Sequence, residues 1–306
     1  MKVLITGGAG YVGTELTKYL LQNKNIKEIV IYDNLSLGHY NFFLGKEYAT
    51  GTRLTFVHGD ILDSRLLRKS LVGVDTVVHL AAKVTTPFAN TDPHFYEQVN
   101  HWGTAEVTYA VEDSGVKNFV YLSSTSVYGA SNQRCDESSK PAPKTYYGIS
   151  KLRGEEHVRR LKSLNKNIIV RCGNVYGYSK SMRFDAVINR FMFDANFKGR
   201  IQINGNGKQS RAFIHVFHVA EMLEKIITND VESGTYNLVD KNLQILDLVD
   251  VLKDIYPDLE FIFMNQHMNL WELTVCPDSS LYNHLERFKS QEFKDEMLEF
   301  RKGFAF

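Results

Sequence analysis

A serine, a tyrosine and a lysine form a set that is able to move protons. Ser124 follows the apolar run Phe119–Leu122, and Tyr147 and Lys151 stand four residues apart in "TYYGISK". On a helix, positions i and i+4 share a face. A free tyrosine has a pKa of about 10, and a nearby lysine ammonium lowers it. The spacing therefore predicts that Tyr147 takes a proton from an alcohol or sugar hydroxyl, while Ser124 holds or relays that proton.

Proton removal of this kind is useful beside a hydride acceptor, and the N-terminal stretch offers a place for one. Gly7, Gly10 and Gly13 lie at intervals of three between the apolar run Val3–Thr6 and the helical stretch Thr14–Gln22. Backbone N–H groups at a helix N-terminus, with no side chains in the way, bind a pyrophosphate. Taken alone, the glycines also fit a tight turn without a ligand. Together with the proton-transfer set they predict a dinucleotide site with a nicotinamide cofactor.

An acidic residue after the second apolar run indicates which dinucleotide binds. The stretch "EIVIYDN" ends in Asp33, about 20 residues beyond the last glycine, where a carboxylate accepts hydrogen bonds from the adenosine ribose and repels a 2′-phosphate. The sequence therefore predicts NAD rather than NADP. Asp60 and Ile61 in "GDI" either contact the adenine or form a normal turn into a helix, and the sequence leaves both open.

These side chains need a scaffold, and the order of apolar runs predicts one. Short β-type runs alternate with segments of helical period, as in Thr14–Gln22, Leu62–Leu71 and Glu97–Ser114. Continuous apolar strands that alternate with helices are typical of a buried parallel sheet. We predict an α/β fold with a doubly wound parallel (Rossmann) sheet, whose strands are Val3–Thr6, Ile29–Tyr32, Leu54–Val57, Thr76–Leu80, Phe119–Leu122 and Ile168–Val170.

The pattern becomes less regular after Cys172. We predict an NAD-binding domain over residues 1–171 and a smaller, mainly substrate-binding α/β domain over 172–306, with some segments of the second part returning to the first lobe. An apolar helical stretch is expected at Val216–Ile227. The tail "SQEFKDEMLEFRKGFAF" is expected to form an amphipathic helix that packs on its own domain or contacts another subunit.

Composition excludes several classes of protein. The 306 residues include 36 basic and 35 acidic side chains, which leaves no electrostatic footprint for nucleic acid. The three cysteines, Cys135, Cys172 and Cys276, form no C-x-x-C pair, which argues against a disulfide framework or a metal site and favours a cytoplasmic location. No run approaches the length of a membrane span, and no signal peptide is recognisable.

The combined motifs resemble the extended short-chain dehydrogenase/reductase family, whose members include nucleotide-sugar epimerases and dehydratases related to UDP-glucose 4-epimerase. The resemblance covers Met1 to about Asp240 and depends on "TGGAGYVG", "YDN", "GDI", "HLAA", "SSTSVYG", "YGISK", "RCGNVYG" and "RAFIHV". It implies a homodimer that pairs through the helices at Glu97–Ser114 and Tyr147–Leu161.

The same resemblance implies roles for individual residues. Around NAD it places Tyr11, Val12, Asn34, Asp60, Ile61, Leu80, Ala81, Ala82, Lys83, Asn100 and Ser123, in addition to the glycines, Asp33, Tyr147 and Lys151. Around a nucleotide-diphosphate sugar it places Thr125, Ser126, Asn174 and Arg211, the last as a charge-assisted donor to a phosphate. His79 is expected to be a packed strand residue without a role in proton transfer.

The two residues after Ser124 narrow the range of reactions that the chain is expected to catalyse. Relatives that dehydrate a sugar carry an acid there, whereas this chain has Thr125 and Ser126. We therefore predict an NAD-dependent 4-epimerase that acts through a 4-keto sugar. A 4-dehydrogenase or 4-ketoreductase uses the same residues and stays open, as does a non-catalytic NAD-sensing regulator. The substrate half also departs from the family pattern, because Asn206, Ala212, Phe217 and His218 stand where acids are common.

Overall fold

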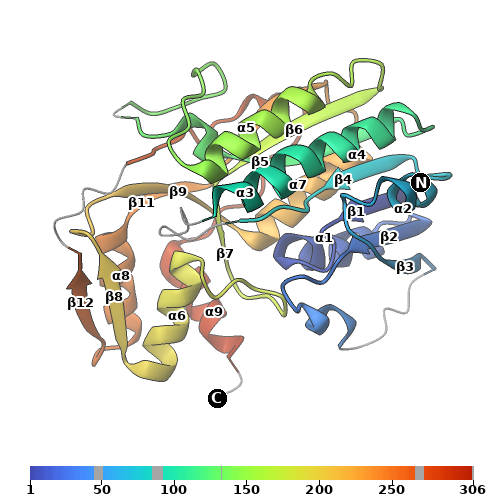
Figure 1. Cartoon of the computed structure of the whole chain (residues 1–306). Helices are drawn as coiled ribbons and strands as arrows, with labels where there is room; N and C mark the ends of the chain where they lie inside the picture. Colours follow the sequence, from blue (N-terminus) through green and yellow to red (C-terminus); the bar gives the residue numbers. More distant parts are fainter. Residues whose placement is uncertain (45–50, 85–91, 132, 266–271, 305–306) are drawn as a thin grey trace.

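The computed structural model describes residues 1–44, 51–84, 92–131, 133–265 and 272–304. Figure 1 shows a larger lobe, built on one sheet, beside a smaller lobe that carries the C-terminal end of the described chain. Within the described ranges, every helix is too short or too polar to cross a lipid bilayer.

The larger lobe contains a fully parallel seven-stranded sheet. All six predicted strands are present in it, and the predicted doubly wound fold is confirmed. The seventh strand, at one edge, comes from the stretch "GTYNL" in the second half of the chain. In spatial order the strands are β10 (Gly234–Leu238), β6 (Lys166–Cys172), β5 (Asn118–Ser124), β4 (Thr76–His79), β1 (Lys2–Thr6), β2 (Glu28–Asp33) and β3 (Arg53–His58).

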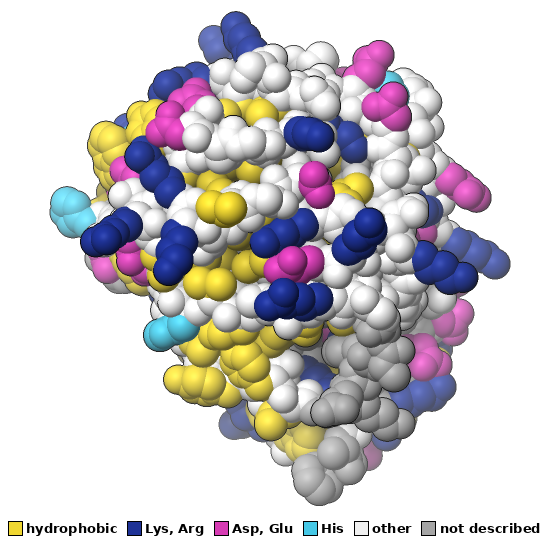
Figure 2. Space-filling model, turned by 90° about the vertical axis from the view of Figure 1, so that its right-hand side faces the viewer, with side chains coloured by type: hydrophobic (Ala, Val, Ile, Leu, Met, Phe, Trp, Pro, Cys, Tyr) yellow, Lys and Arg dark blue, Asp and Glu magenta, His cyan; other side chains and the backbone are white. Residues whose placement is uncertain are grey.

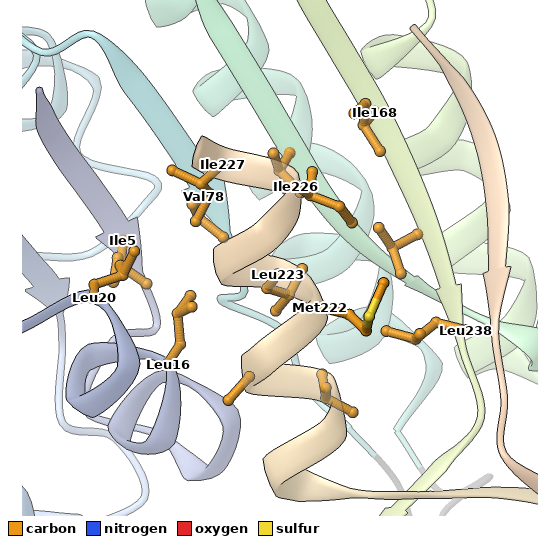
Figure 3. Close-up of a cluster of buried hydrophobic side chains, with 14 of the residues drawn as sticks. Ile5, Leu16, Leu20, Val78, Ile168, Met222, Leu223, Ile226, Ile227 and Leu238 are labelled. Atoms are coloured by element: carbon orange, nitrogen blue, oxygen red, sulfur yellow. The ribbon is translucent and has the colours of Figure 1, made fainter. Parts of the chain in front are cut away.

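Helices cover both faces of this sheet because its strands are apolar on both sides. One face packs against α1 (Tyr11–Gln22) and α7 (Val216–Thr228), and Figure 3 shows side chains of both helices meeting those of the central strands. The other face packs against α2 (Ser64–Ser70), α4 (Gly103–Glu112) and α5 (Tyr146–Val158). Both α7 and β10 follow residue 172 in the chain, so segments from the second half complete the larger lobe.

The helix predicted at Glu97–Ser114 is not one regular α-helix. It consists of a π-helical segment η2 (Glu97–Trp102) followed by α4, and the short helix α3 (Pro93–Tyr96) precedes it. The wider π turn carries Asn100, whose side chain is fully buried and bonded outside its own helix. Periodicity predicted the helical segment but not this local widening, which is common near functional sites.

The smaller lobe has its own core. A three-stranded sheet has the order β11 (Lys241–Gln244), β9 (Ser210–His215) and β7 (Asn174–Tyr176), and a two-stranded sheet pairs β12 (Glu260–Met264) with β8 (Arg200–Asn204). They share a hydrophobic cluster with α6 (Val187–Lys198), α8 (Ile245–Ile255) and α9 (Phe293–Lys302). The C-terminal helix α9 thus packs within its own lobe. The division into domains at residues 171 and 172 stays a prediction.

The surface beside the β3 edge is mixed in charge. Figure 2 shows Lys and Arg side chains interspersed with Asp and Glu over this face, and hydrophobic side chains gathered in its lower part. This face therefore presents no large area of one sign.

Candidate active site

The three predicted proton-transfer residues come together where β5 ends and α5 begins. Thr145 caps α5 by accepting a hydrogen bond from the Gly148 N–H (3.0 Å), which places Tyr147 in the first turn and Lys151 in the next. Ser124 is the last residue of β5, and its side chain lies close enough to the Tyr147 hydroxyl to lower the pKa of Tyr147. The two hydroxyls are therefore neighbours, as a hydroxyl relay requires.

Burial shifts the pKa values of both Tyr147 and Lys151. Burial raises the pKa of Tyr147, while the hydrogen bond with Ser124 and the charge of Arg183 lower it. Burial lowers the pKa of Lys151 to about 7, and its ammonium lies over the ring of Tyr121, 4.1 Å from the ring centroid. Lys151 is thus poised to titrate near neutral pH. The expected lowering of the Tyr147 pKa by the Lys151 charge stays a prediction.

The three glycines of the N-terminal loop are required for different reasons. Gly7 has a φ of +69°, and a Cβ there would lie 2.6 Å from the Ala81 nitrogen, while a Cβ on Gly13 would lie 2.5 Å from the Gly8 oxygen. A Cβ on Gly10 would meet only the Gly7 oxygen, at 3.1 Å. Gly7 and Gly13 therefore permit packing within the protein, whereas Gly10 leaves space open beside the loop.

The start of α1 suits a pyrophosphate. Gly10 is its N-cap and provides no side-chain acceptor, so the first backbone N–H groups of the helix, including those of Tyr11 and Val12, have no cap from a side chain. Such a terminus favours an anion. The open space at Gly10 and the uncapped N–H groups together fit a dinucleotide.

Asp33 lies at the end of β2, beside this loop. Its carboxylate accepts hydrogen bonds from the Ala9 N–H (3.0 Å) and the Leu35 N–H (2.8 Å). Asn34, the next residue, donates to the Asp60 carboxylate (2.8 Å), so Asp60 and the β2 end are connected. These contacts hold the Asp33 carboxylate beside the glycine loop, and its expected role toward the adenosine ribose stays a prediction. Ile61 is buried beneath α4, where a Cβ on Gly103 would lie 2.4 Å from it.

The segment after β4 packs against the glycine loop. Leu80, Ala81 and Ala82 are partly buried, and Ala81 packs against Gly7. The Asn100 amide accepts a hydrogen bond from the Lys83 N–H (2.7 Å) and donates to the Lys83 carbonyl (2.9 Å), while it also donates to Ser150 on α5 (3.0 Å). Asn100 therefore fixes this segment to the catalytic helix.

His79 is packed, as expected from the sequence. Its two ring nitrogens lie 2.6 Å from Thr6 Oγ1 and 3.0 Å from Thr104 Oγ1, and the ring is fully buried. Burial lowers the pKa of His79 to about 3. The ring is neutral at physiological pH.

The other hydroxyls after β5 point to different partners. The Ser123 hydroxyl donates to the Glu155 carboxylate (2.6 Å), so its side chain faces α5. Thr125 is buried, and Ser126 is partly exposed and donates its N–H to Ser124 Oγ (3.1 Å). The expected roles of Ser123 toward NAD and of Thr125 and Ser126 toward the sugar stay predictions.

Asn174 and Arg211 lie close together on neighbouring strands of the smaller lobe. The Asn174 amide donates to the carbonyl of Ala212, the residue after Arg211 (2.9 Å). Burial lowers the pKa of Arg211 and the charge of Glu272 raises it, but no carboxylate among the described residues lies within ion-pairing distance of its guanidinium. A half-buried cation of this kind favours an anionic ligand.

The structure adds a residue that the sequence reasoning missed. Arg183, in the segment between β7 and α6, forms a bidentate ion pair with Asp185, and its charge acts on Tyr147. Its carbonyl accepts a hydrogen bond from Asn189 (3.0 Å), which also donates to the Tyr11 hydroxyl (3.3 Å). Tyr11 thus links α1 to the segment that carries Arg183. Arg183 lies outside the quoted motifs, six residues after "RCGNVYG", and gave no signal in the sequence.

His218, one of the unusual residues of the second half, lies in a buried charged cluster. Its Nδ1 is 4.0 Å from Asp240, and Glu296 from α9 is nearby. The Lys241 ammonium lies 3.2 Å from Asp240 and 2.8 Å from Glu296, and the Arg287 guanidinium lies 3.7 Å from Asp240, so two cations already balance these carboxylates. The cluster joins α7, β11 and α9.

Comparison with known proteins places this geometry in context. A family model described as "NAD dependent epimerase/dehydratase family" matches residues 3–238. A putative UDP-glucose 4-epimerase of Methanocaldococcus jannaschii is 28% identical over 258 residues, which cover 82% of this chain and 81% of the relative. A dTDP-D-glucose 4,6-dehydratase of Mus musculus is 29% identical over 78% of this chain and 67% of its own.

A solved structure shares the whole architecture. The UDP-N-acetylglucosamine 4-epimerase from Methanobrevibacter ruminantium M1, in complex with UDP-N-acetylmuramic acid, superposes with a TM-score of 0.83 and 25% identity. The match covers 99% of this chain and 97% of that chain.

Proposed function

The chain belongs to the NAD-dependent epimerase/dehydratase family, and from this premise we propose that it is a nucleotide-sugar 4-epimerase that acts through a 4-keto intermediate. It is an enzyme with NAD as its cofactor. Relatives in this family include both epimerases and dehydratases, so the choice between the two depends on the residues of this chain.

The closeness of Ser124 and Tyr147 is the observation that carries the proposal. Ser124 lies near enough to lower the pKa of Tyr147, and Lys151 lies on the same face of α5 one turn further along. This set supports removal and return of the proton of one hydroxyl group. Thr125 and Ser126 come next in the chain, and neither has the acidic group that loss of water would require. Epimerisation needs only the proton and hydride transfers.

The proposed mechanism assigns one task to each residue. Tyr147 removes the proton of the sugar 4-hydroxyl, and Ser124 orients that hydroxyl through its own hydrogen bond. NAD, which the glycine loop and Asp33 would hold, would supply the acceptor and donor of the C4 hydride, and the keto sugar would turn so that the hydride returns to its other face. Lys151 in its protonated form stabilises the Tyr147 phenolate. Tyr147 then returns the proton to the 4-oxygen.

Residues of the smaller lobe are proposed to hold the diphosphate of the substrate. Arg211 is a half-buried cation without an ion-pair partner among the described residues, and Asn174 lies beside it. A diphosphate would accept charge-assisted hydrogen bonds from Arg211, and its negative charge would neutralise that of the guanidinium. Arg183 lies nearer to Tyr147 and is proposed to face the same substrate.

A homodimer in the cytoplasm completes the proposal. The η2 and α5 surfaces expose apolar side chains, with Trp102 57% exposed and Tyr146 43% exposed, which supports pairing through these helices. The cysteines are free, as is usual in a reducing compartment.

A substrate panel tests the activity. The purified enzyme is incubated with UDP-, GDP-, CDP- and dTDP-sugars, and the products are identified by NMR together with the redox state of the released cofactor. We expect the C4 epimer of one sugar with no net change in nicotinamide redox state. Stoichiometric reduction of NAD with release of a keto sugar would instead establish the 4-dehydrogenase, and a dehydrated product would overturn the choice of reaction.

A further inference from the structure

Glu155 lies one helical turn beyond Lys151 on α5. Tyr147, Lys151 and Glu155 occupy positions i, i+4 and i+8 and therefore lie along one face of the helix. The Glu155 side chain is fully buried, and the proposed mechanism gives it no task. A buried carboxylate is costly unless charged and polar partners surround it.

Each oxygen of the Glu155 carboxylate accepts two hydrogen bonds. Oε1 accepts from Ser123 Oγ (2.6 Å) and from Arg171 Nε (3.0 Å). Oε2 accepts from Arg171 Nη2 (2.8 Å) and from Arg159 Nη2 (2.6 Å). One carboxylate thus connects the catalytic helix to both β5 and β6.

These contacts lie directly beside the proton-transfer residues. Ser123 and Arg171 are opposite each other in the register of β5 and β6, and the next pair in that register is Ser124 with Cys172. Ser124 and Cys172 both lie close enough to Tyr147 to act on its pKa. A change in the Glu155 contacts would therefore shift Tyr147 relative to Ser124.

We propose that Glu155 is a positioning residue that fixes α5 against the ends of β5 and β6 and that its charge favours the protonated form of Lys151. The part of the proposal that concerns turnover rests on the proposed function. The part that concerns charge does not need a substrate.

The charges around Lys151 support this role. The groups that face Lys151 and Glu155 are Tyr147 and Arg159 on α5, Tyr121 on β5, Arg171 on β6, His79 on β4 and, beyond Arg171, Tyr128. Burial lowers the Lys151 pKa, and the Glu155 charge opposes that effect. Without this carboxylate, Lys151, Arg171 and Arg159 would face one another with no anion between them, and Lys151 would lose its proton at lower pH.

The Lys151 ammonium reports this charge without a substrate. Its titration is followed by NMR of the lysine side chains in the NAD-loaded protein, and the Lys151 signal is assigned by its absence from Lys151→Arg. In Glu155→Gln the ammonium loses its neighbouring anion, so we expect the Lys151 midpoint to fall by about one pH unit. An unchanged midpoint in folded Glu155→Gln would overturn the proposal.

Two further variants distinguish charge from packing. Arg159→Gln removes an exposed cation that competes for Glu155, so the Lys151 midpoint should rise slightly, in the direction opposite to Glu155→Gln. Ser123→Ala removes one hydrogen bond without changing the charge, so kcat should fall several-fold while the Lys151 midpoint stays in place. If Glu155→Gln does not fold, Arg159→Gln decides, because an unchanged or lowered Lys151 midpoint there contradicts the proposal. The titration remains informative even if the 4-epimerase activity is absent.

Discussion

The Asp33 carboxylate accepts a hydrogen bond from the backbone N–H of Ala9 at 3.0 Å, which fixes the end of β2 to the glycine loop. The same carboxylate accepts from the Leu35 N–H, so its position is set from both sides. A negative charge held at this point is adjacent to the place proposed for the adenosine ribose. The contact therefore connects loop geometry with cofactor choice.

The first prediction concerns that choice. Since a 2′-phosphate would approach the Asp33 carboxylate, we expect NAD to bind at least tenfold more tightly than NADP, which corresponds to about 1.4 kcal/mol. Titration of the apo-protein with both cofactors measures the ratio. Asp33→Asn should reduce the preference for NAD over NADP. Equal affinities in the unmodified protein would contradict the role proposed for Asp33.

The second prediction compares two glycines of one loop. A Cβ on Gly10 finds only one close atom, whereas a Cβ on Gly13 overlaps the Gly8 backbone. Gly10→Ala should therefore keep the melting temperature but weaken NAD binding. Gly13→Ala should destabilise the fold by about 1–3 kcal/mol. Calorimetry and cofactor titration on both variants distinguish them, and a Gly10→Ala protein with unchanged NAD affinity would argue against a pyrophosphate at that position.

Local sequence signals predicted the parts of the fold that depend on short segments. The six central strands, the glycine loop and the helix with Tyr147 and Lys151 each have a pattern within about a dozen residues, and the structure contains them all. Two features had no such signal. The π turn at Asn100 depends on partners from Lys83 and Ser150, and β10 joins the sheet by pairing with β6, more than sixty residues earlier. Contacts between segments that are distant in the sequence determine both the π turn and the position of β10.

The third prediction concerns stability in acid. The His79 pKa is lowered by burial from 6.5 to about 3, so below about pH 6.5 the unfolded chain binds a proton that the folded protein does not. The free energy of unfolding should therefore fall as the pH drops, by about 1.4 kcal/mol per pH unit from this group. Urea unfolding between pH 7 and pH 5 measures the slope. His79→Gln should reduce this slope by the amount that corresponds to about one proton. An identical slope in the variant would show that His79 is not the group responsible.

The fourth prediction concerns assembly. Trp102 is largely exposed on the proposed dimer surface, so the chain should have the mass of a dimer in light scattering at micromolar concentration. Trp102→Glu places a charge in that contact and should shift the population toward monomer. A monomeric mass for the unmodified chain would refute pairing through these helices.

The most direct test of the proposed chemistry is the turnover of Tyr147→Phe on the sugar that the substrate panel identifies, measured as C4 epimer by NMR. The substitution removes one oxygen and keeps the ring, so the folded protein should still carry NAD. Because general acid–base help is worth about 10²–10⁴-fold, we predict a fall in kcat of roughly 10³. A variant that retains NAD and more than about a tenth of the original kcat would contradict the role of Tyr147 as the proton acceptor.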